Sequence, residues 1–81
     1  MNPSQLQPIE VTARFDKDGH LTPLSFTRQG RTYPLDSGGR RWQDDAGQHF
    51  LVMAPGEQVF ELLFDPATLR WSLLRRGPAV A

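Results

Sequence analysis

The chain has 81 residues, enough for one domain with one modest core, because a domain of this size buries only about 60% of its unfolded surface. It has no cysteine, which excludes disulfides and thiolate metal sites. Its nine basic and nine acidic side chains cancel, which excludes the uniform field of an obvious nucleic-acid binder. The longest apolar stretch, Phe50 to Ala54, is too short to cross a bilayer. We therefore expect a cytoplasmic protein with no membrane partner.

Polar, aperiodic segments at 1–7 and 77–81 are typical of flexible tails, which leaves a single domain over 8–76. The first predicted strand, 9–15, alternates apolar and polar residues without a break. This pattern places Ile9, Val11, Ala13 and Phe15 on one face. The turn residues Asp16-Lys17-Asp18-Gly19 then predict a hairpin.

The second predicted strand, 20–28, directs Leu24 and Phe26 inward. Pro23 lacks a backbone N–H group for the ladder, so it indicates either a sheet edge or a bulge. The pair Gln29-Gly30 reverses the chain into a third strand, 31–35, with Tyr33 and Leu35 on one face.

A loop is predicted at 36–39 from its composition. Two further strands, 40–42 and 48–53, flank a second turn rich in aspartate and glycine, Asp44-Asp45-Ala46-Gly47. Pro55-Gly56 marks the next reversal.

The segment 58–64 fits a short helix through one set of apolar positions and a strand through another. The type I turn signal Asp65-Pro66-Ala67-Thr68 favours the strand, because a following strand over 70–73 can pair with it. If Asp65 faces Arg70, then Phe64 meets Trp71, and Leu62 meets Leu73 in the same hairpin.

Turn signals every eight to twelve residues, with no convincing helix, predict an all-β fold: a small antiparallel meander of about six strands. A small sheet with one apolar face must curl to bury that face. We therefore expect a half-open barrel rather than a flat sheet.

Aromatic and turn residues spread over 9–74 resemble those of a bacterial family of short domains of unknown function. The matching positions are Phe26, Gly30, Arg31, Tyr33, Trp42, His49, Phe50, Val52, Phe60, Glu61, Leu62, Phe64, Asp65, Thr68, Trp71 and Leu73. Members of that family stand alone or accompany proteins related to Y-family translesion DNA polymerases. The resemblance implies a DNA-related setting and no defined activity.

Candidate metal and catalytic groups have ordinary structural explanations. The segment Asp16 to Gly19 fails the spacing of a calcium loop, which would place glycine at Leu21 and glutamate at Thr27. Asp44 and Asp45 are interpreted as solvated turn residues, and Glu61 as a carboxylate in an exposed ion pair, with a buried catalytic role left open.

The two histidines lack the spacing of a zinc site. His49 is interpreted as a surface or half-buried strand residue. The segment Gly38-Gly39-Arg40 lacks the lysine and hydroxyl of a phosphate-binding loop. We therefore predict no metal, no cofactor and no catalytic residue, and an enzyme is the least favoured class.

Eight of the nine cations are arginines, and four of them lie in the middle of the chain near two aromatic residues. A small β-barrel can bind single-stranded nucleic acid through a basic groove and stacking rings. The candidate residues are Arg28, Arg31, Tyr33, Arg40, Arg41 and Trp42. The alternative is that both rings are core residues and that the arginines are solvated.

Two functions remain open for an interaction module. The first is weak binding of single-stranded nucleic acid or of a DNA-processing protein. The second is a protein-docking module that offers a free strand edge, such as that of the strand containing Pro23, to an extended peptide.

Overall fold

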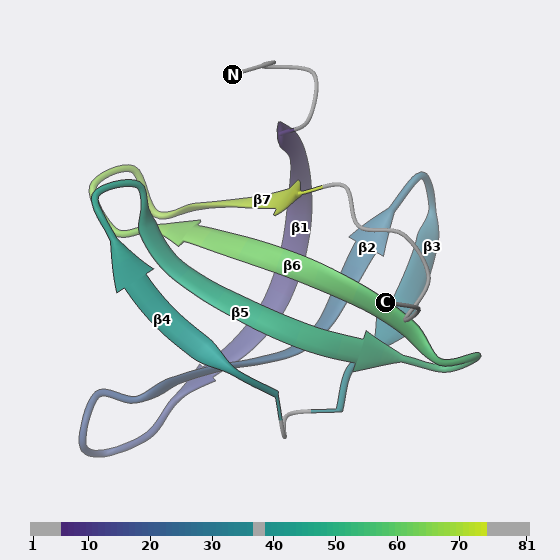
Figure 1. The fold of residues 1–81 in the computed structure, drawn as a ribbon, viewed down its shortest axis with the longest axis horizontal. Helices are drawn as coiled ribbons and strands as arrows, with labels where there is room; N and C mark the ends of the chain where they lie inside the picture. The colour runs from purple at the N-terminus through teal and green to yellow at the C-terminus, as the bar shows by residue number, and fades with distance from the viewer. Residues whose placement is uncertain (1–5, 37–38, 75–81) are drawn as a thin grey trace.

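The computed structural model describes residues 6–36 and 39–74. These residues form an all-β domain with no helix, as predicted, and seven strands instead of about six (Figure 1). The strands are β1 (Leu6–Phe15), β2 (Leu21–Arg28), β3 (Arg31–Pro34), β4 (Arg41–Asp44), β5 (Gly47–Ala54), β6 (Gln58–Asp65) and β7 (Arg70–Leu74). The ambiguous segment is therefore a strand. Apart from Leu6 and Gln7, which belong to β1, the predicted tails lie outside the described residues.

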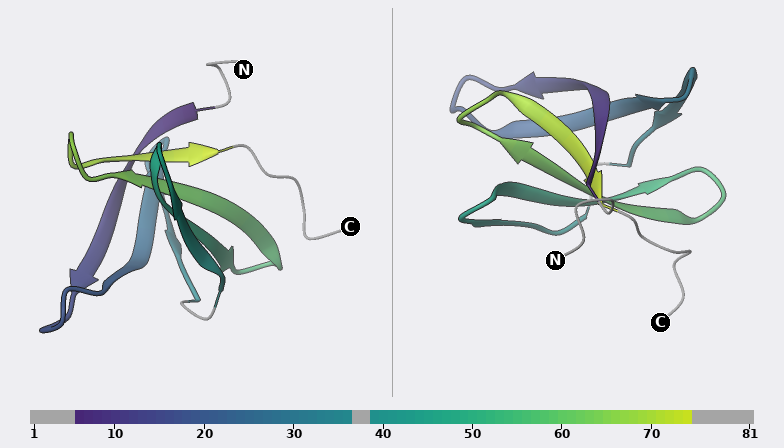
Figure 2. Two further views of the ribbon diagram at one scale, coloured as in Figure 1. Left: turned by 60° about the vertical axis from the view of Figure 1, so that its left-hand side comes forward. Right: turned by 90° about the horizontal axis from the view of Figure 1, so that it is seen from above.

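All strand pairs are antiparallel, in the order β3-β2-β1-β7-β6-β5-β4. Strand β1 pairs with β7 only over Leu6–Ile9 and then continues alongside β2. The sheet therefore folds over itself at β1, so that β1 and β2 lie across β5 and β6 (Figures 1 and 2). The sheet is curled but not closed, which confirms the half-open meander.

The core lies on the inner face of this curled sheet. Alternating residues of β5 and β6, including Phe50, Val52 and Leu62, are buried against Phe26 of β2 and Leu73 of β7. Sheet alternation explains the pattern, because residues two apart in a strand share a face.

The last hairpin has the register that its turn predicts. Asp65 is opposite Arg70, Phe64 is opposite Trp71, and Leu62 is opposite Leu73. The Asp65 carboxylate accepts a hydrogen bond from the Ala67 backbone N–H at 2.9 Å, as expected for an aspartate that begins a type I turn.

Pro23 marks a bulge, and its strand is not an edge strand. The β1–β2 register passes from Thr12 opposite Ser25 to Ala13 opposite Pro23, so that Leu24 is the extra residue. The bulge reverses the expected sides: Pro23 is buried and Leu24 is exposed. The prediction that Leu24 faces inward is therefore wrong.

The far half of β1 also differs from its prediction. Ile9 and Val11 pack against the core, but Ala13 is exposed and Phe15 is 65% exposed. Strand β7 reaches only as far as Ile9, so the rest of β1 extends beyond the strands that could bury Phe15. The alternating pattern predicts the strand correctly, but it does not predict how much of the strand is covered by other strands.

The connection from β3 to β4 brings the two ends of the sheet close together. The Asp36 N–H donates to the Met53 carbonyl at 2.9 Å, and the Leu51 N–H donates to the Arg40 carbonyl at 2.8 Å. Gly39 passes so close to β5 that a Cβ atom there would overlap the Leu51 carbonyl oxygen. The described part of the chain contains no helix long and apolar enough to cross a membrane.

Candidate functional site

The four arginines lie in two separate places. Arg28 and Arg31 face each other beside the β2–β3 turn, whereas Arg40 and Arg41 lie at the start of β4. The β2–β3 turn and β4 are on opposite sides of the domain in Figure 1. The fold therefore brings the predicted site residues together as two pairs and not as one continuous groove.

Tyr33 is one of the two rings expected to stack on bases. Its ring is stacked on Phe26, with centroids 4.9 Å apart, and meets the edge of Phe60 at 5.8 Å. The Arg31 guanidinium lies over the ring, 5.3 Å from its centroid. Tyr33 therefore packs against the core, and the protein's own side chains occupy its stacking positions.

Trp42 lies on the outer face of the sheet, away from the apolar core. Its ring is stacked on the His49 ring, with centroids 5.0 Å apart and planes 4° from parallel. The Arg40 guanidinium lies 5.4 Å from the centroid of Trp42. Two of the protein's own side chains therefore already contact the Trp42 ring.

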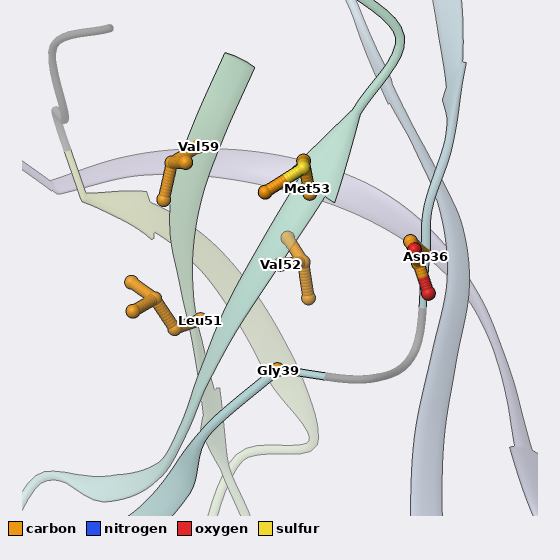
Figure 3. Close-up of a pocket in the computed structure, with 6 residues that line it drawn as sticks. All are labelled: Asp36, Gly39, Leu51, Val52, Met53 and Val59. Atoms are coloured by element: carbon orange, nitrogen blue, oxygen red, sulfur yellow. The ribbon is translucent and has the colours of Figure 1, made fainter. Parts of the chain in front are cut away.

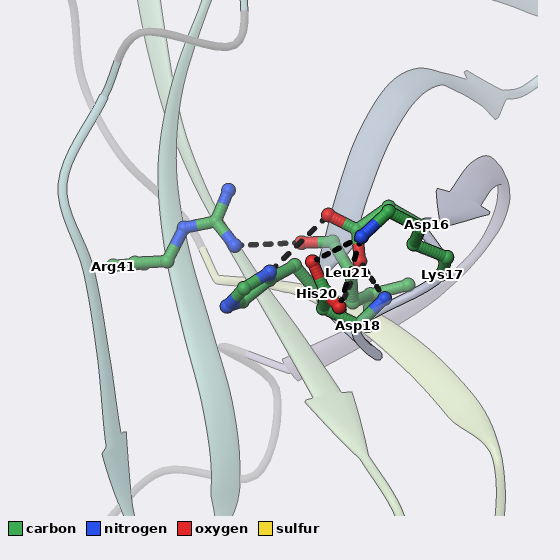
Figure 4. Close-up of polar contacts among 6 residues, drawn as sticks. All are labelled: Asp16, Lys17, Asp18, His20, Leu21 and Arg41. Carbon is green, nitrogen blue, oxygen red and sulfur yellow. Dashed lines mark hydrogen bonds and ion pairs between the residues drawn. The ribbon is translucent and has the colours of Figure 1, made fainter.

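Arg41 connects β4 to β2. Its Nη1 donates to the Leu21 carbonyl oxygen at 2.8 Å, and its guanidinium lies 5.1 Å from the centroid of Phe50 (Figure 4). Strand β3 pairs with β2 only over Ser25–Arg28, so Leu21–Pro23 have no β3 partner. We call this unpaired part of β2, together with the facing β4, the β2–β4 gap.

The register shows which backbone groups face the β2–β4 gap. Because the Leu51 N–H donates to the Arg40 carbonyl, alternate residues of β4 direct their backbone groups to β5, and Arg41 and Gln43 direct theirs to the free edge. On the other side, the Leu21 carbonyl faces away from β1 and accepts from a side chain instead of a strand.

The most enclosed polar group was not predicted from the sequence. His49 and Glu61 are only 6% and 7% exposed, and His49 Nδ1 is 2.8 Å from Glu61 Oε2. The other ring nitrogen, Nε2, is 2.9 Å from Oδ2 of Asp44. These three side chains form what we call the His49 network, which joins β4, β5 and β6.

The two carboxylates contact His49 differently. The Glu61 contact has hydrogen-bond geometry, whereas the Asp44 oxygen lies outside the hydrogen-bond direction of Nε2, so this contact is an ion pair by distance. The nearby His49 ring holds the pKa of the Asp44 carboxyl below its usual value of 3.8 and outweighs the opposing effect of burial, and the backbone N–H groups of Ala46 and Gly47 lower this pKa further. Both ring nitrogens of His49 face carboxylates, so the network is better suited to holding charge than to accepting a proton from a substrate.

Two interpretations from the sequence are corrected by the His49 network. His49 is buried and not a surface or half-buried residue, and Glu61 is not in an exposed ion pair. Asp44 is an exposed turn residue, as predicted, and its carboxylate also contacts His49. The available signal was the hairpin at Pro55-Gly56. Counting back from Ala54 opposite Gln58 places His49 diagonally across from Glu61 on one face.

The β1–β2 turn gathers Asp16, Asp18 and His20, with one potential ligand atom from each within 4.8 Å of the others (Figure 4). Asp16 Oδ1 accepts the backbone N–H groups of Asp18 and His20, at 2.8 and 2.9 Å. Asp16 Oδ2 is 3.2 Å from His20 Nδ1. This aspartate therefore organises the hairpin turn, and both of its carboxylate oxygens already contact nitrogen atoms of the turn.

A pocket of about 230 Å³ lies beside β5, lined by Asp36, Gly39, Leu51, Val52, Met53 and Val59 (Figure 3). Of these described residues only Asp36 carries a charge, and its backbone N–H pairs with Met53. The walls are mainly apolar, so the pocket offers a contact surface and no set of catalytic groups. Gly38, a residue of the segment compared with a phosphate-binding loop, lies outside the described residues.

No protein-family model, curated protein or solved structure matches the chain. We therefore infer the function from the geometry of the β2–β4 gap, the arginine pairs and the His49 network.

Proposed function

We propose that the domain is an interaction module that binds an extended peptide along the free edge of β4. The observation that carries this proposal is the hydrogen bond from Arg41 to the Leu21 carbonyl. In that contact a side chain, and not a neighbouring strand, donates to a carbonyl of β2.

The two edge strands of the sheet differ in what they offer a peptide. The free edge of β3 includes Pro34, which has no N–H to donate. Strand β4 contains no proline, and both Arg41 and Gln43 direct a backbone N–H and carbonyl outward. Strand addition uses such main-chain groups for affinity and alternate side chains for specificity. The edge of β4 is therefore the better docking edge.

A proline substitution tests this edge directly. Gln43→Pro removes an outward N–H but leaves the pairing of β4 with β5, so the variant should remain folded and lose peptide binding. The probes are blocked ten-residue peptides with alternating β-branched and polar residues, titrated while the amide signals of Arg41 and Gln43 are followed by NMR.

The matched control places the same substitution on the other edge strand. Thr32→Pro removes an outward N–H from β3, because Leu35 pairs with Leu24 and the alternation directs Thr32 away from β2. This variant should bind peptide like the parent protein. Equal loss in both variants, or no binding by the parent at about 1 mM peptide, would contradict strand addition on β4.

A second candidate function is weak binding of single-stranded nucleic acid, favoured by the exposed guanidinium groups of Arg31 and Arg40. The overall charge is zero, so we expect a dissociation constant no tighter than about 10 micromolar at physiological salt. The log–log plot of affinity against salt should have a slope of roughly −2 to −3, whereas peptide docking should respond little to salt.

Charge reversal tests this alternative. Arg31→Glu and Arg40→Glu should each reduce the affinity for a labelled oligonucleotide at low salt. Arg41 is unsuitable for this test, because its side chain, although exposed, donates to the Leu21 carbonyl and its loss would also change the contact between β4 and β2. In line with the family resemblance, we propose a DNA-processing protein as the source of the docked peptide.

A further inference from the structure

Strand β4, which carries the proposed docking edge, has one strand partner. It pairs over four residues with β5. Two of its side chains, Trp42 and Asp44, are two positions apart and therefore share the outer face. Both contact His49, through ring stacking in the first case and an ion pair in the second.

The chemistry of imidazole makes this arrangement depend on a proton. A neutral ring has one N–H donor and one lone pair, so it can donate to only one of two carboxylates. The other nitrogen would then lie less than 3 Å from a negative oxygen without a proton to offer it. His49 Nδ1 is 2.8 Å from Glu61 Oε2 and Nε2 is 2.9 Å from Asp44 Oδ2, so a ring that carries N–H groups on both nitrogens, and hence a positive charge, is attracted by both carboxylates.

We propose that His49 is the positioning residue of β4, and that it holds this strand in place as an imidazolium bound between Glu61 and Asp44. Loss of the proton removes the attraction to Asp44 and loosens β4 from the sheet. His49 has this role in the protein without a bound peptide. Only the consequence, control of the docking edge by pH, rests on the proposed function.

The charged groups around His49 are consistent with this assignment. Strand β6 contributes Glu61 to the ring, and β4 contributes Asp44. Within the described part of the chain, the cation Arg40 lies over the ring of Trp42, 5.4 Å from its centroid, and makes no ion pair with the Asp44 or Glu61 carboxylates that contact His49. Two anions thus contact the ring directly.

NMR measures both halves of the proposal in one pH titration. The ring nitrogen shifts of His49 report its protonation, and the protection factors of the Trp42 and Asp44 amides report the attachment of β4 to β5. We expect both nitrogens to carry protons while β4 is protected. We also expect the protection to fall about tenfold with the same midpoint as the ring titration, as for loss of one charge-assisted contact.

Two variants separate this role from a purely structural one. Asp44→Asn keeps the buried His49–Glu61 pair and should reduce the pH-dependent part of β4 protection. His20→Gln removes the other histidine, which is exposed and contacts Asp16, and should leave the β4 titration unchanged.

Several results would overturn the proposal. These are a neutral His49 ring while β4 is fully protected, a β4 transition whose midpoint differs from that of the ring, or an Asp44→Asn protein with the parent's β4 titration. None of these measurements uses a peptide. Failure of the proposed role of His49 and failure of peptide docking are therefore distinguishable.

Discussion

On the inner face of the β5–β6 hairpin, Phe50, Val52 and Leu62 are buried in an apolar cluster, whereas the buried side chains His49 and Glu61 on the outer face are ionisable. The apolar cluster is stabilised by the removal of apolar surface from water, and this effect does not depend on the direction of a contact. The hydrogen bond between His49 and Glu61 stabilises the fold only when its donor and acceptor are both present and aligned. The two faces should therefore respond differently to substitution.

The largest effect is expected on the inner face. Leu62 is 0% exposed, so Leu62→Ala should reduce the free energy of unfolding by about 3 to 5 kcal/mol, through lost burial and the cavity left behind. Urea denaturation measures this loss. The control is Met53→Ala on the outer face, where the parent side chain is 46% exposed and the loss should be under about 0.5 kcal/mol. Similar losses in both variants would contradict the assignment of the two faces.

Breaking the His49 network should have the next largest effect. Glu61→Leu leaves the His49 ring without its aligned partner and should cost about 3 kcal/mol. The double variant His49→Leu, Glu61→Leu removes both ionisable groups, so its loss should be smaller than the sum of the two single losses by about 1 kcal/mol or more. Additive losses in urea denaturation would mean that the two side chains are not coupled.

Acid should expose the smallest of the three effects. The folded-state pKa of Asp44 is lowered, chiefly by the His49 ring. Stability from this carboxylate is therefore fully present above its usual pKa of 3.8 and is lost as the pH falls through the lowered value. Asp44→Asn should flatten the decline in melting temperature below about pH 4.

The control for the acid experiment is Asp45→Asn, which removes a carboxylate from the same turn and keeps Asp44. It should preserve the parent's acid sensitivity. Asp16 also has a lowered pKa, caused mainly by the backbone N–H of His20, so part of the decline should persist in Asp44→Asn. An Asp44→Asn protein with the full decline would exclude any contribution of Asp44 to acid stability.

The sequence predicted best what turn chemistry and alternation determine locally. Asp65-Pro66 specified the register that places Phe64 opposite Trp71, because a tight turn fixes which residues face each other. The alternation of 9–15 likewise identified β1. The exposure of Phe15 could not be predicted, because it depends on where β7 ends relative to β1.

The candidate site was harder to predict, because its contacts join residues that are distant in the sequence. Alternation places Glu61 and His49 on the polar side of their strands, and polar strand positions are usually solvated. Their burial depends on the diagonal register of β5 and β6 and on the Trp42 ring from β4. The two arginine pairs are separated for a similar reason, since Arg28 and Arg31 flank the turn at one end of β3, whereas Arg40 and Arg41 follow the other end of that strand, at the start of β4.

The pairing of β1 with β7 has a consequence for how the chain acquires its fold. Leu6 is opposite Leu74, so the first and last strands meet in the middle of the sheet, and the two halves cannot join until β7 is available. In every other pair of neighbouring strands in the sheet, the two strands follow each other directly in the chain. A circular permutant that joins the Leu74 end of β7 to the Leu6 end of β1 through a linker, and opens the chain between β3 and β4, would make every neighbouring pair consecutive. Its lower contact order should make it refold faster than the parent while keeping the same sheet.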